Sequence, residues 1–268
     1  MEDYFYLKVL SYVIGWIYFF AWSLSFYPQG LLNWKKKSVA GFSLEFAILN
    51  VSGYIFYSMY STGGKIYPHL GTGIIQNNDL VFAIHAFFLA STHLSQVFIY
   101  DRGKQTTFQP WAIYLLVTLW TCVLTTFMLE GIMGVNEIPK SVNTFKMAGY
   151  GKAIITFSKY CPQVYLNWKR KSTVGWSMFN VMCDLTGGTF SIIQQIIDMI
   201  YHGKTKGDWS FFGSNTGTFN IVKFFLGVIT IGFDLTFIVQ HYILYPHKEE
   251  EKKDEIEFNK INKSPLLK

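Results

Sequence analysis

The chain contains few charged residues for its length. Of its 268 residues, 15% are Asp, Glu, Lys or Arg, whereas soluble globular domains carry about 25%. Half of the residues are hydrophobic and 19% are aromatic. Several apolar runs also reach the roughly 20 residues needed to cross a bilayer. The composition therefore argues against a soluble domain and predicts an integral membrane protein embedded in lipid.

The sequence also lacks the usual signs of an enzyme or a metal site. The three cysteines, Cys122, Cys161 and Cys183, lie in apolar runs and have neither metal-ligand spacing nor extracellular pairing. We expect them to pack as small apolar residues. No Gly-rich phosphate loop and no Ser/His/Asp set stands out in the sequence. We therefore expect no enzymatic activity, no cofactor and no metal ion.

A nucleic-acid-binding surface is not indicated, although the net charge is +6. The basic residues form short clusters between apolar runs, such as Lys35–Lys37 and Lys169–Lys171. In membrane proteins such clusters report orientation. The N-terminus lacks the basic stretch and the small-residue cleavage site of a signal peptide, so we expect the first apolar run to be retained.

Seven apolar segments are long enough to span a membrane. They cover about residues 10–32, 42–60, 80–100, 110–129, 147–167, 176–201 and 218–245. Taken together, the first, third and fifth loops carry more Lys and Arg than the second, fourth and sixth together, which predicts that the odd-numbered loops face the cytosol. A short N-terminus, 1–9, then faces the lumen, and the Glu/Lys-rich tail, 246–268, is cytosolic. We expect this tail to be disordered.

An internal repeat relates two of these regions. When Pro28 is aligned with Pro162 without gaps, Gln29 meets Gln163, and identities continue through the basic loop into the next span. Four spans separate the copies, so both have the same orientation. We predict an all-α integral membrane protein of seven helices. Two parallel three-helix repeats, 10–100 and 147–245, are joined by a linker helix within 101–146, with a substrate site between the halves.

Acidic side chains inside the spans predict where this site lies, because charge is costly within a membrane. Asp184 and Asp234 lie well inside spans, and Asp79 lies at the mouth of the third. Burial disfavours the charged form of a carboxyl group, so we expect these three acids to bind and release protons. Asp184 takes the place of Asn50 in the repeat alignment. Asn180 lies four residues before Asp184 and shares its helix face.

The two Pro-Gln pairs predict hinges. Pro28 and Pro162 lack a backbone N–H and interrupt the helical hydrogen bonding. With Gln29 and Gln163, they lie near the ends of the first and fifth spans. We expect these helix ends to move and to close one face of the site.

The Pro-Gln pairs, each near the end of a first helix and before a short basic loop, resemble the signature of PQ-loop membrane proteins. Within this family the chain resembles the proton-coupled lysosomal exporters of cystine, over nearly all of residues 12–245. The similar stretches are Ala21–Gln29, Asn78–Ala86, Lys159–Gln163, Lys171–Ser177, Asp184–Gly188 and Phe233–His241.

The resemblance implies symport of protons and cystine from the lysosomal lumen to the cytosol by alternating access. It places the chain in the lysosomal membrane as a multi-pass protein. Cystine, protons, the lipid bilayer and lysosomal nutrient-signalling complexes would be its partners. It also implies that Asn167, Asn180, Asp184 and Lys223 contact the substrate. Other polar or aromatic residues that the two repeats offer to a zwitterion are Trp22, Asn50, Lys159 and Gln163.

Two other functions fit the same fold. A PQ-loop transporter could carry a cationic amino acid or a sugar instead, although sugar facilitators need no buried acids and this chain has Asp184 and Asp234. A seven-helix sorting receptor would bind luminal proteins without moving a substrate. A measurement of substrate flux separates these possibilities.

Overall fold

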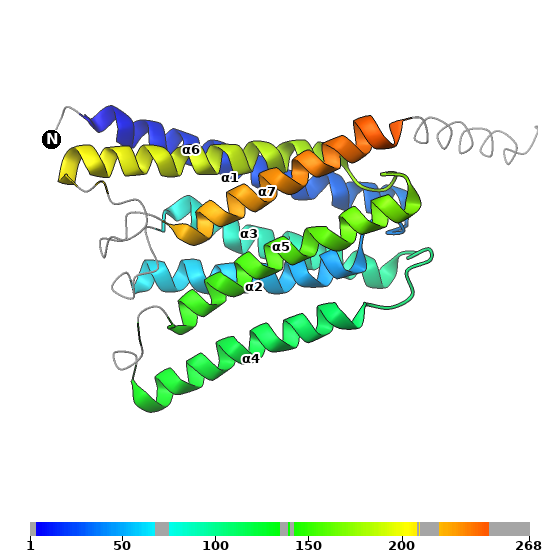
Figure 1. Ribbon diagram of the computed structural model, residues 1–268, viewed down its shortest axis with the longest axis horizontal. Helices are drawn as coiled ribbons and strands as arrows, with labels where there is room; N and C mark the ends of the chain where they lie inside the picture. The colour runs from blue at the N-terminus through cyan, green and yellow to red at the C-terminus, as the bar shows by residue number, and fades with distance from the viewer. Residues whose placement is uncertain are drawn as a thin grey trace, which may run out of the picture.

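The computed structural model describes residues 4–67, 75–134, 139, 142–207, 209 and 220–246. In this part of the chain, seven long helices lie roughly alongside one another (Figure 1). The described residues form no strand, only one isolated bridge. The predicted all-α, seven-helix architecture is confirmed. The elements are α1 (Phe5–Lys36), α2 (Leu44–Ile66), α3 (Asn77–Ile99), α4 (Pro110–Met133), α5 (Thr144–Arg170), α6 (Met178–Lys206), α7 (Ile221–Val239) and a terminal π-helical turn, η3 (Gln240–Leu244).

Four helices are long and apolar enough to cross a membrane by length and composition alone. They are α1, α3, α4 and the continuous segment of α7 and η3. The other three helices, α2, α5 and α6, have 23, 27 and 29 residues, but they contain more polar side chains. Several of these, including Asn50, Lys159 and Gln194, are buried against other helices. Their lower hydropathy therefore reflects a polar interior between the helices.

The two repeats pack in equivalent ways. Helix α2 packs on α3 as α6 packs on α7, and α1 packs on α3 as α5 packs on α7. Each repeat also places its second helix against the first helix of the other repeat, in the pairs α1–α6 and α2–α5. Helix α4 lies at the edge of the bundle, beside α5 and α2 (Figure 1). The interior between the repeats is thus built from α1, α2, α5 and α6, with α3 and α7 completing it.

The repeated sequence produces repeated local structure. Lys37 and Lys171 end α1 and α5 in the left-handed conformation, each with φ of 49°. Ser43 and Ser177 then begin α2 and α6, because each hydroxyl accepts a hydrogen bond from a backbone N–H in the first turn. We call the end of the bundle that carries these two loops and their lysines the basic end. The opposite end, where α1 begins, is the N-terminal end.

The helix boundaries differ in detail from the predicted spans. Helix α1 begins at Phe5, so residues 5–9, expected to belong to the N-terminal segment, are helical. Both α1 and α5 continue as helices through Pro28 and Pro162. Their action as hinges stays a prediction. Residues 247–268 of the predicted tail lie outside the described residues.

Candidate functional site

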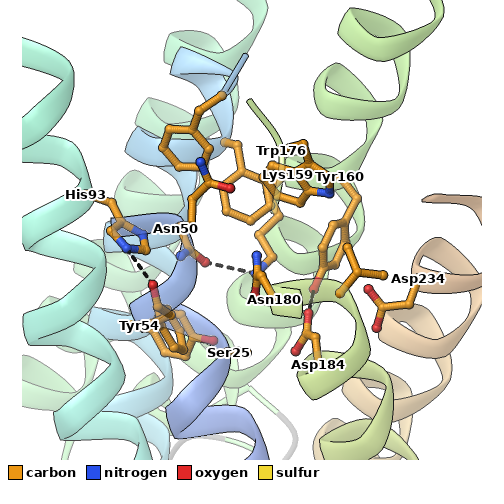
Figure 2. A pocket seen from close by; sticks show the side chains of 15 residues that line it. Ser25, Asn50, Tyr54, His93, Lys159, Tyr160, Trp176, Asn180, Asp184 and Asp234 are labelled. Atoms are coloured by element: carbon orange, nitrogen blue, oxygen red, sulfur yellow. Dashed lines mark hydrogen bonds between the residues drawn. The ribbon is translucent and has the colours of Figure 1, made fainter. Parts of the chain in front are cut away.

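A small cavity lies between the two repeats, lined by residues of both (Figure 2). Its lining residues lie between the middle of the bundle and the basic end. Its volume is about 30 Å³, room for one or two water molecules. Sites for small molecules usually measure about 300–1,000 Å³. An amino-acid-sized substrate therefore needs the surrounding helices to move apart.

The walls of this cavity are related by the internal repeat. Five pairs of lining residues occupy equivalent positions of the alignment, so the cavity lies on the pseudo-two-fold axis. The first repeat contributes mainly aromatic and small residues, and the second contributes a lysine, an amide and an acid. In these pairs, both charged side chains, Lys159 and Asp184, come from the second repeat. The pairs are Ser25 and Lys159, Phe26 and Tyr160, Phe42 and Trp176, Phe46 and Asn180, and Asn50 and Asp184.

Two hydrogen bonds fix polar side chains that line the cavity. Lys159 Nζ donates to Asn50 Oδ1 across the repeats, at 2.9 Å. The Tyr160 hydroxyl donates to Asp184 Oδ2 at 2.7 Å. The Lys159 ammonium group also lies 4.9 Å from the centre of the Phe46 ring, within the range of a cation–π interaction. The predicted residues Asn50, Lys159 and Asp184 are therefore brought together.

Some polar groups at the cavity have no partner among the described residues. Asp234 is 1% exposed, and its Oδ2 atom accepts no hydrogen bond there. The indole N–H of Trp176 is likewise buried without an acceptor in that part of the chain. An unsatisfied buried polar group costs free energy. The unpartnered Asp234 oxygen and Trp176 N–H therefore favour the binding of a polar ligand or a proton in the cavity.

A buried lysine next to the cavity was missed by the sequence reasoning. Lys152 on α5 is 3% exposed. Its ammonium group lies 3.7 Å from the centre of the Tyr54 ring and 5.9 Å from that of Tyr57. No described acidic residue forms an ion pair with it. Lys152 and Lys159 are seven residues apart on one helix, so two positive charges share a face. A lysine inside an apolar span was a sufficient signal to find it.

At the basic end, Gln29 joins its own repeat to the other one. Its Nε2 group donates to Asn33 Oδ1 at 2.8 Å and to the carbonyl oxygen of Gly175 at 3.0 Å. Its Oε1 atom accepts from the backbone N–H of Ser177 at 2.9 Å. The side chain of the first Pro-Gln motif therefore holds the loop of the second repeat.

Gln163 makes the equivalent bonds from the second repeat to the loop of the first repeat. Its Nε2 group donates to Asn167 Oδ1 at 3.0 Å and to the carbonyl oxygen of Gly41 at 3.1 Å. Its Oε1 atom accepts from the backbone N–H of Ser43 at 2.8 Å. We call these two sets of bonds the glutamine latch. Together they close the basic end above the cavity.

Two further amides extend the glutamine latch within each repeat. Asn33 donates to Gln96 on α3 at 2.9 Å, and Asn167 donates to Gln240 at the end of α7 at 3.0 Å. Asn167 is fully buried in this network and does not line the cavity. In this conformation, Gln163 and Asn167 therefore hold helices together, and their contact with substrate stays a prediction.

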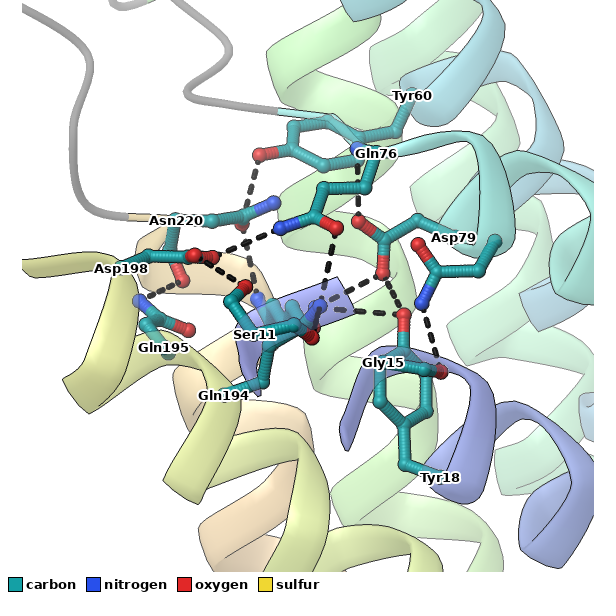
Figure 3. Close-up of polar contacts among 12 residues, drawn as sticks. Ser11, Gly15, Tyr18, Tyr60, Gln76, Asp79, Gln194, Gln195, Asp198 and Asn220 are labelled. Atoms are coloured by element: carbon teal, nitrogen blue, oxygen red, sulfur yellow. Dashed lines mark hydrogen bonds and ion pairs between the residues drawn. The ribbon is translucent and has the colours of Figure 1, made fainter. Parts of the chain in front are cut away.

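A second polar network closes the N-terminal end (Figure 3). Lys223 on α7 forms an ion pair with Asp79 on α3, with 3.0 Å between Nζ and Oδ1. The Tyr18 hydroxyl donates to the same carboxylate, and Lys223 also donates to Gln194 Oε1 at 2.6 Å. These residues, which we call the ion-pair gate, join α1, α3, α6 and α7.

The predicted site residues thus divide into separate groups. Gln29, Asn50, Lys159, Asn180, Asp184 and Asp234 line the cavity. Asp79 and Lys223 lie in the ion-pair gate. Trp22 is buried in an aromatic cluster, stacked on Phe82, where a side chain at Gly187 of α6 would collide with it. This cluster separates the cavity from the ion-pair gate.

Comparison with known proteins identifies the motif and the relatives. A family model described as PQ loop repeat matches residues 10–66 and 144–199, which hold α2 and α5 and most of α1 and α6. A cystinosin homolog of Dictyostelium discoideum is 38% identical over 264 residues, covering 95% of this chain and 88% of that protein. Bovine cystinosin is 37% identical over 254 residues, covering 90% and 65%. A cystine transporter of Saccharomyces cerevisiae is 28% identical over 254 residues, covering 87% and 94%.

Two matched repeats on a seven-helix bundle define a membrane protein of the PQ-loop class. The similarity to relatives in several kingdoms extends well beyond the motif, across all seven helices. The chain belongs to the cystinosin family.

Proposed function

We propose that this protein exports cystine together with protons from the lysosomal lumen to the cytosol by alternating access. The names of its relatives, cystinosin and cystine transporter, support the substrate. The observation that carries the proposal is a cavity on the axis of the two repeats, lined by Lys159 and by two acids, Asp184 and Asp234, with a second buried lysine, Lys152, beside it.

The charges around the cavity suit a zwitterion. Cystine carries two ammonium and two carboxylate groups, and each needs a partner away from water. Lys152 and Lys159 would face carboxylates, while Asp184 and Asn180 would face ammonium groups. Two buried lysines also disfavour a cationic amino acid as cargo, because like charges repel strongly at low dielectric. A sugar would leave these charges without partners.

The acids at the cavity support the proposal of proton coupling. A charged Asp234 with an unpartnered buried oxygen is unfavourable, and binding a proton removes that cost. Asp184 and Asp234 line the same cavity, so their two negative charges also oppose each other. We therefore assign proton binding to this pair when the site faces an acidic lumen, and release when it faces the cytosol.

Alternating access is supported by the two separate polar networks that close the two ends of the bundle. The glutamine latch closes the basic end, and the ion-pair gate closes the N-terminal end. The two networks share no residue, so one can open while the other holds. We assign the basic end to the cytosol and the N-terminal end to the lumen, in agreement with the distribution of Lys and Arg. Binding of nutrient-signalling complexes at the cytosolic face stays a prediction of the family resemblance.

The decisive experiment measures flux in a defined system. The purified protein is reconstituted into vesicles, and cystine uptake is followed with an acidic outside and a neutral inside. We expect uptake that collapses when the pH gradient is removed, with an inward current on adding cystine. Excess lysine, arginine or glucose should not compete. Absence of gradient-driven cystine uptake would overturn the proposal.

A further inference from the structure

A second, larger pocket lies at the N-terminal end of the bundle, outside the central cavity. Its volume is about 590 Å³, within the range of small-molecule sites. It is formed where the start of α1 meets the last turns of α6, with Gln76 before α3 forming part of its wall. The charged and polar residues that line it include Lys8, Ser11, Gln76, Asp198 and His202.

The acid in this pocket forms no ion pair with a described lysine or arginine. Asp198 accepts hydrogen bonds from the Ser11 hydroxyl and, at 2.8 Å, from Gln76 Nε2 (Figure 3). Among the described residues, no Lys or Arg lies within ion-pair distance of its carboxylate. A partly buried carboxylate held by two neutral donors is well placed to accept an ammonium group, since charge-assisted hydrogen bonds are the stronger ones.

A cation of the same pocket is also unpaired. Lys8 lies on the first turns of α1, is exposed, and forms no ion pair with a described acidic residue. Helix α1 has 32 residues and is therefore about 48 Å long, whereas the hydrocarbon core measures about 30 Å. The pocket thus lies at the level of the headgroups, where solutes can reach it from water. It offers one negative and one positive group, as an amino-acid zwitterion requires.

The pocket is connected to the ion-pair gate through Gln76. The backbone N–H of Gln76 donates to Asp79 Oδ2 at 3.0 Å, while its side-chain amide donates to Asp198. Its Oε1 atom accepts from Gln194, which in turn accepts from Lys223. A ligand that changes the contacts of Asp198 therefore acts on the residues that close this end.

We propose that this pocket is an entry site that captures the amino-acid end of the substrate before the ion-pair gate opens. Asp198 accepts from the ammonium group, and Lys8 faces the carboxylate. The proposal rests on cystine export as the function of the protein. It assigns the zwitterion two successive sites, one at the N-terminal end and one at the central cavity.

The test compares the variants Asp198→Asn and Lys8→Gln with the wild type, in the vesicle assay with cystine outside at acidic pH. Asp198→Asn keeps the shape and one acceptor, and Lys8→Gln changes an exposed residue that does not support the fold. We expect the apparent KM for cystine to rise about tenfold or more for Asp198→Asn and about two- to fivefold for Lys8→Gln. The maximal rate should stay within about a factor of two, because saturating substrate reaches the central site without capture. The control is Lys65→Gln, an exposed lysine at the same end that does not line the pocket.

The outcomes separate the two proposals. If the wild type takes up no cystine, cystine export itself is overturned. If the wild type takes up cystine and either variant keeps the wild-type KM, only the entry site is overturned. A lower maximal rate with unchanged KM in Asp198→Asn would also overturn it, because that result assigns Asp198 to the structure of the gate. A KM for Lys65→Gln as high as that of Lys8→Gln would also overturn the entry site, because the rise in KM would then come from the loss of surface charge in general.

Discussion

At the scale of single residues, the most informative feature is the divergence of the two repeats around one cavity. At equivalent positions the first repeat has Ser25, Phe46 and Asn50, where the second has Lys159, Asn180 and Asp184. The backbone frame is shared, so the charged chemistry arises from side-chain changes in one copy. Substitutions at these positions should therefore change transport more than they change folding.

Asp234 provides the first test at this scale. In Asp234→Asn the side chain keeps its size but loses its titratable group, so we expect cystine uptake to lose its dependence on outside pH. The initial rate is measured in vesicles at several outside pH values, with Glu130→Gln, an acid that caps the start of α5, as the control. Full pH dependence in both Asp234→Asn and Asp184→Asn would rule out these residues as proton carriers.

Lys152 provides the second test. In Lys152→Met the apolar stem is retained while the buried charge is removed, so the fold should be as stable as the wild type or more stable. We expect cystine uptake to fall at least about tenfold, the loss of one charge-assisted hydrogen bond to a carboxylate. Uptake and the melting temperature in detergent are measured together, with the exposed Lys204→Met as the control. Wild-type uptake by Lys152→Met would exclude a contact with substrate.

At the scale of helices and loops, reciprocal contacts between the two repeats hold the basic end of the bundle together. Each Pro-Gln glutamine bonds to the loop of the other repeat, and the two loops meet at Gly41 and Gly175. Gly175 has φ of 94°, and a Cβ atom there would lie 2.8 Å from the Cα atom of Gly41. Neither loop can therefore shift without disturbing its counterpart, and the end should open as a unit.

The glutamine latch predicts symmetric mutants. Gln29→Ala and Gln163→Ala each remove three hydrogen bonds, so both should favour opening at the basic end to a similar degree. The measurement is labelling of Val181→Cys, a buried cavity residue, by a membrane-impermeant maleimide added from that side. The background has Cys122, Cys161 and Cys183 replaced by alanine.

The control for the latch is Gln105→Ala. This glutamine lies at the same end, but among the described residues its hydrogen bonds go to the first repeat, to Val39, Ala40, Phe42 and the backbone N–H of Leu44. Its labelling rate should stay close to that of the unmutated background. Equal labelling of all three glutamine variants would show that the reciprocal bonds have no special part in closing the basic end.

At the scale of the whole molecule, orientation can be tested directly. If the basic end faces the cytosol, Lys104→Cys in intact organelles should react with an impermeant maleimide added outside, and Lys204→Cys should react only after permeabilisation. Both lysines are exposed, and they lie at opposite ends of the bundle. The reverse pattern would invert the proposed direction of transport.

Much of this architecture was predictable from the sequence. The repeat of Pro28–Gly53 at Pro162–Gly187 required two equivalent helix pairs, and the acids inside the spans pointed to the cavity. What the sequence could not supply was the partner of each polar side chain. Gln163, Asn167 and Lys223 all look like residues of one polar site, yet the structure places them at opposite ends. Their separation depends on contacts with Gly41, Gln240 and Asp79, which lie far from them in the chain.

The reciprocal glutamines also carry a historical consequence. A single three-helix unit with one Pro-Gln motif would satisfy the same hydrogen bonds by pairing with a second copy of itself, as the two faces of a symmetric dimer do. The ends of such a unit lie on opposite sides of the membrane. Fusing two units in the same orientation therefore needs one extra crossing, and α4, at the edge of the bundle, supplies it. The fold thus has the geometry expected of two such units fused in one chain, and the charged residues of the cavity, Lys159, Asp184 and Asp234, all lie in the second unit.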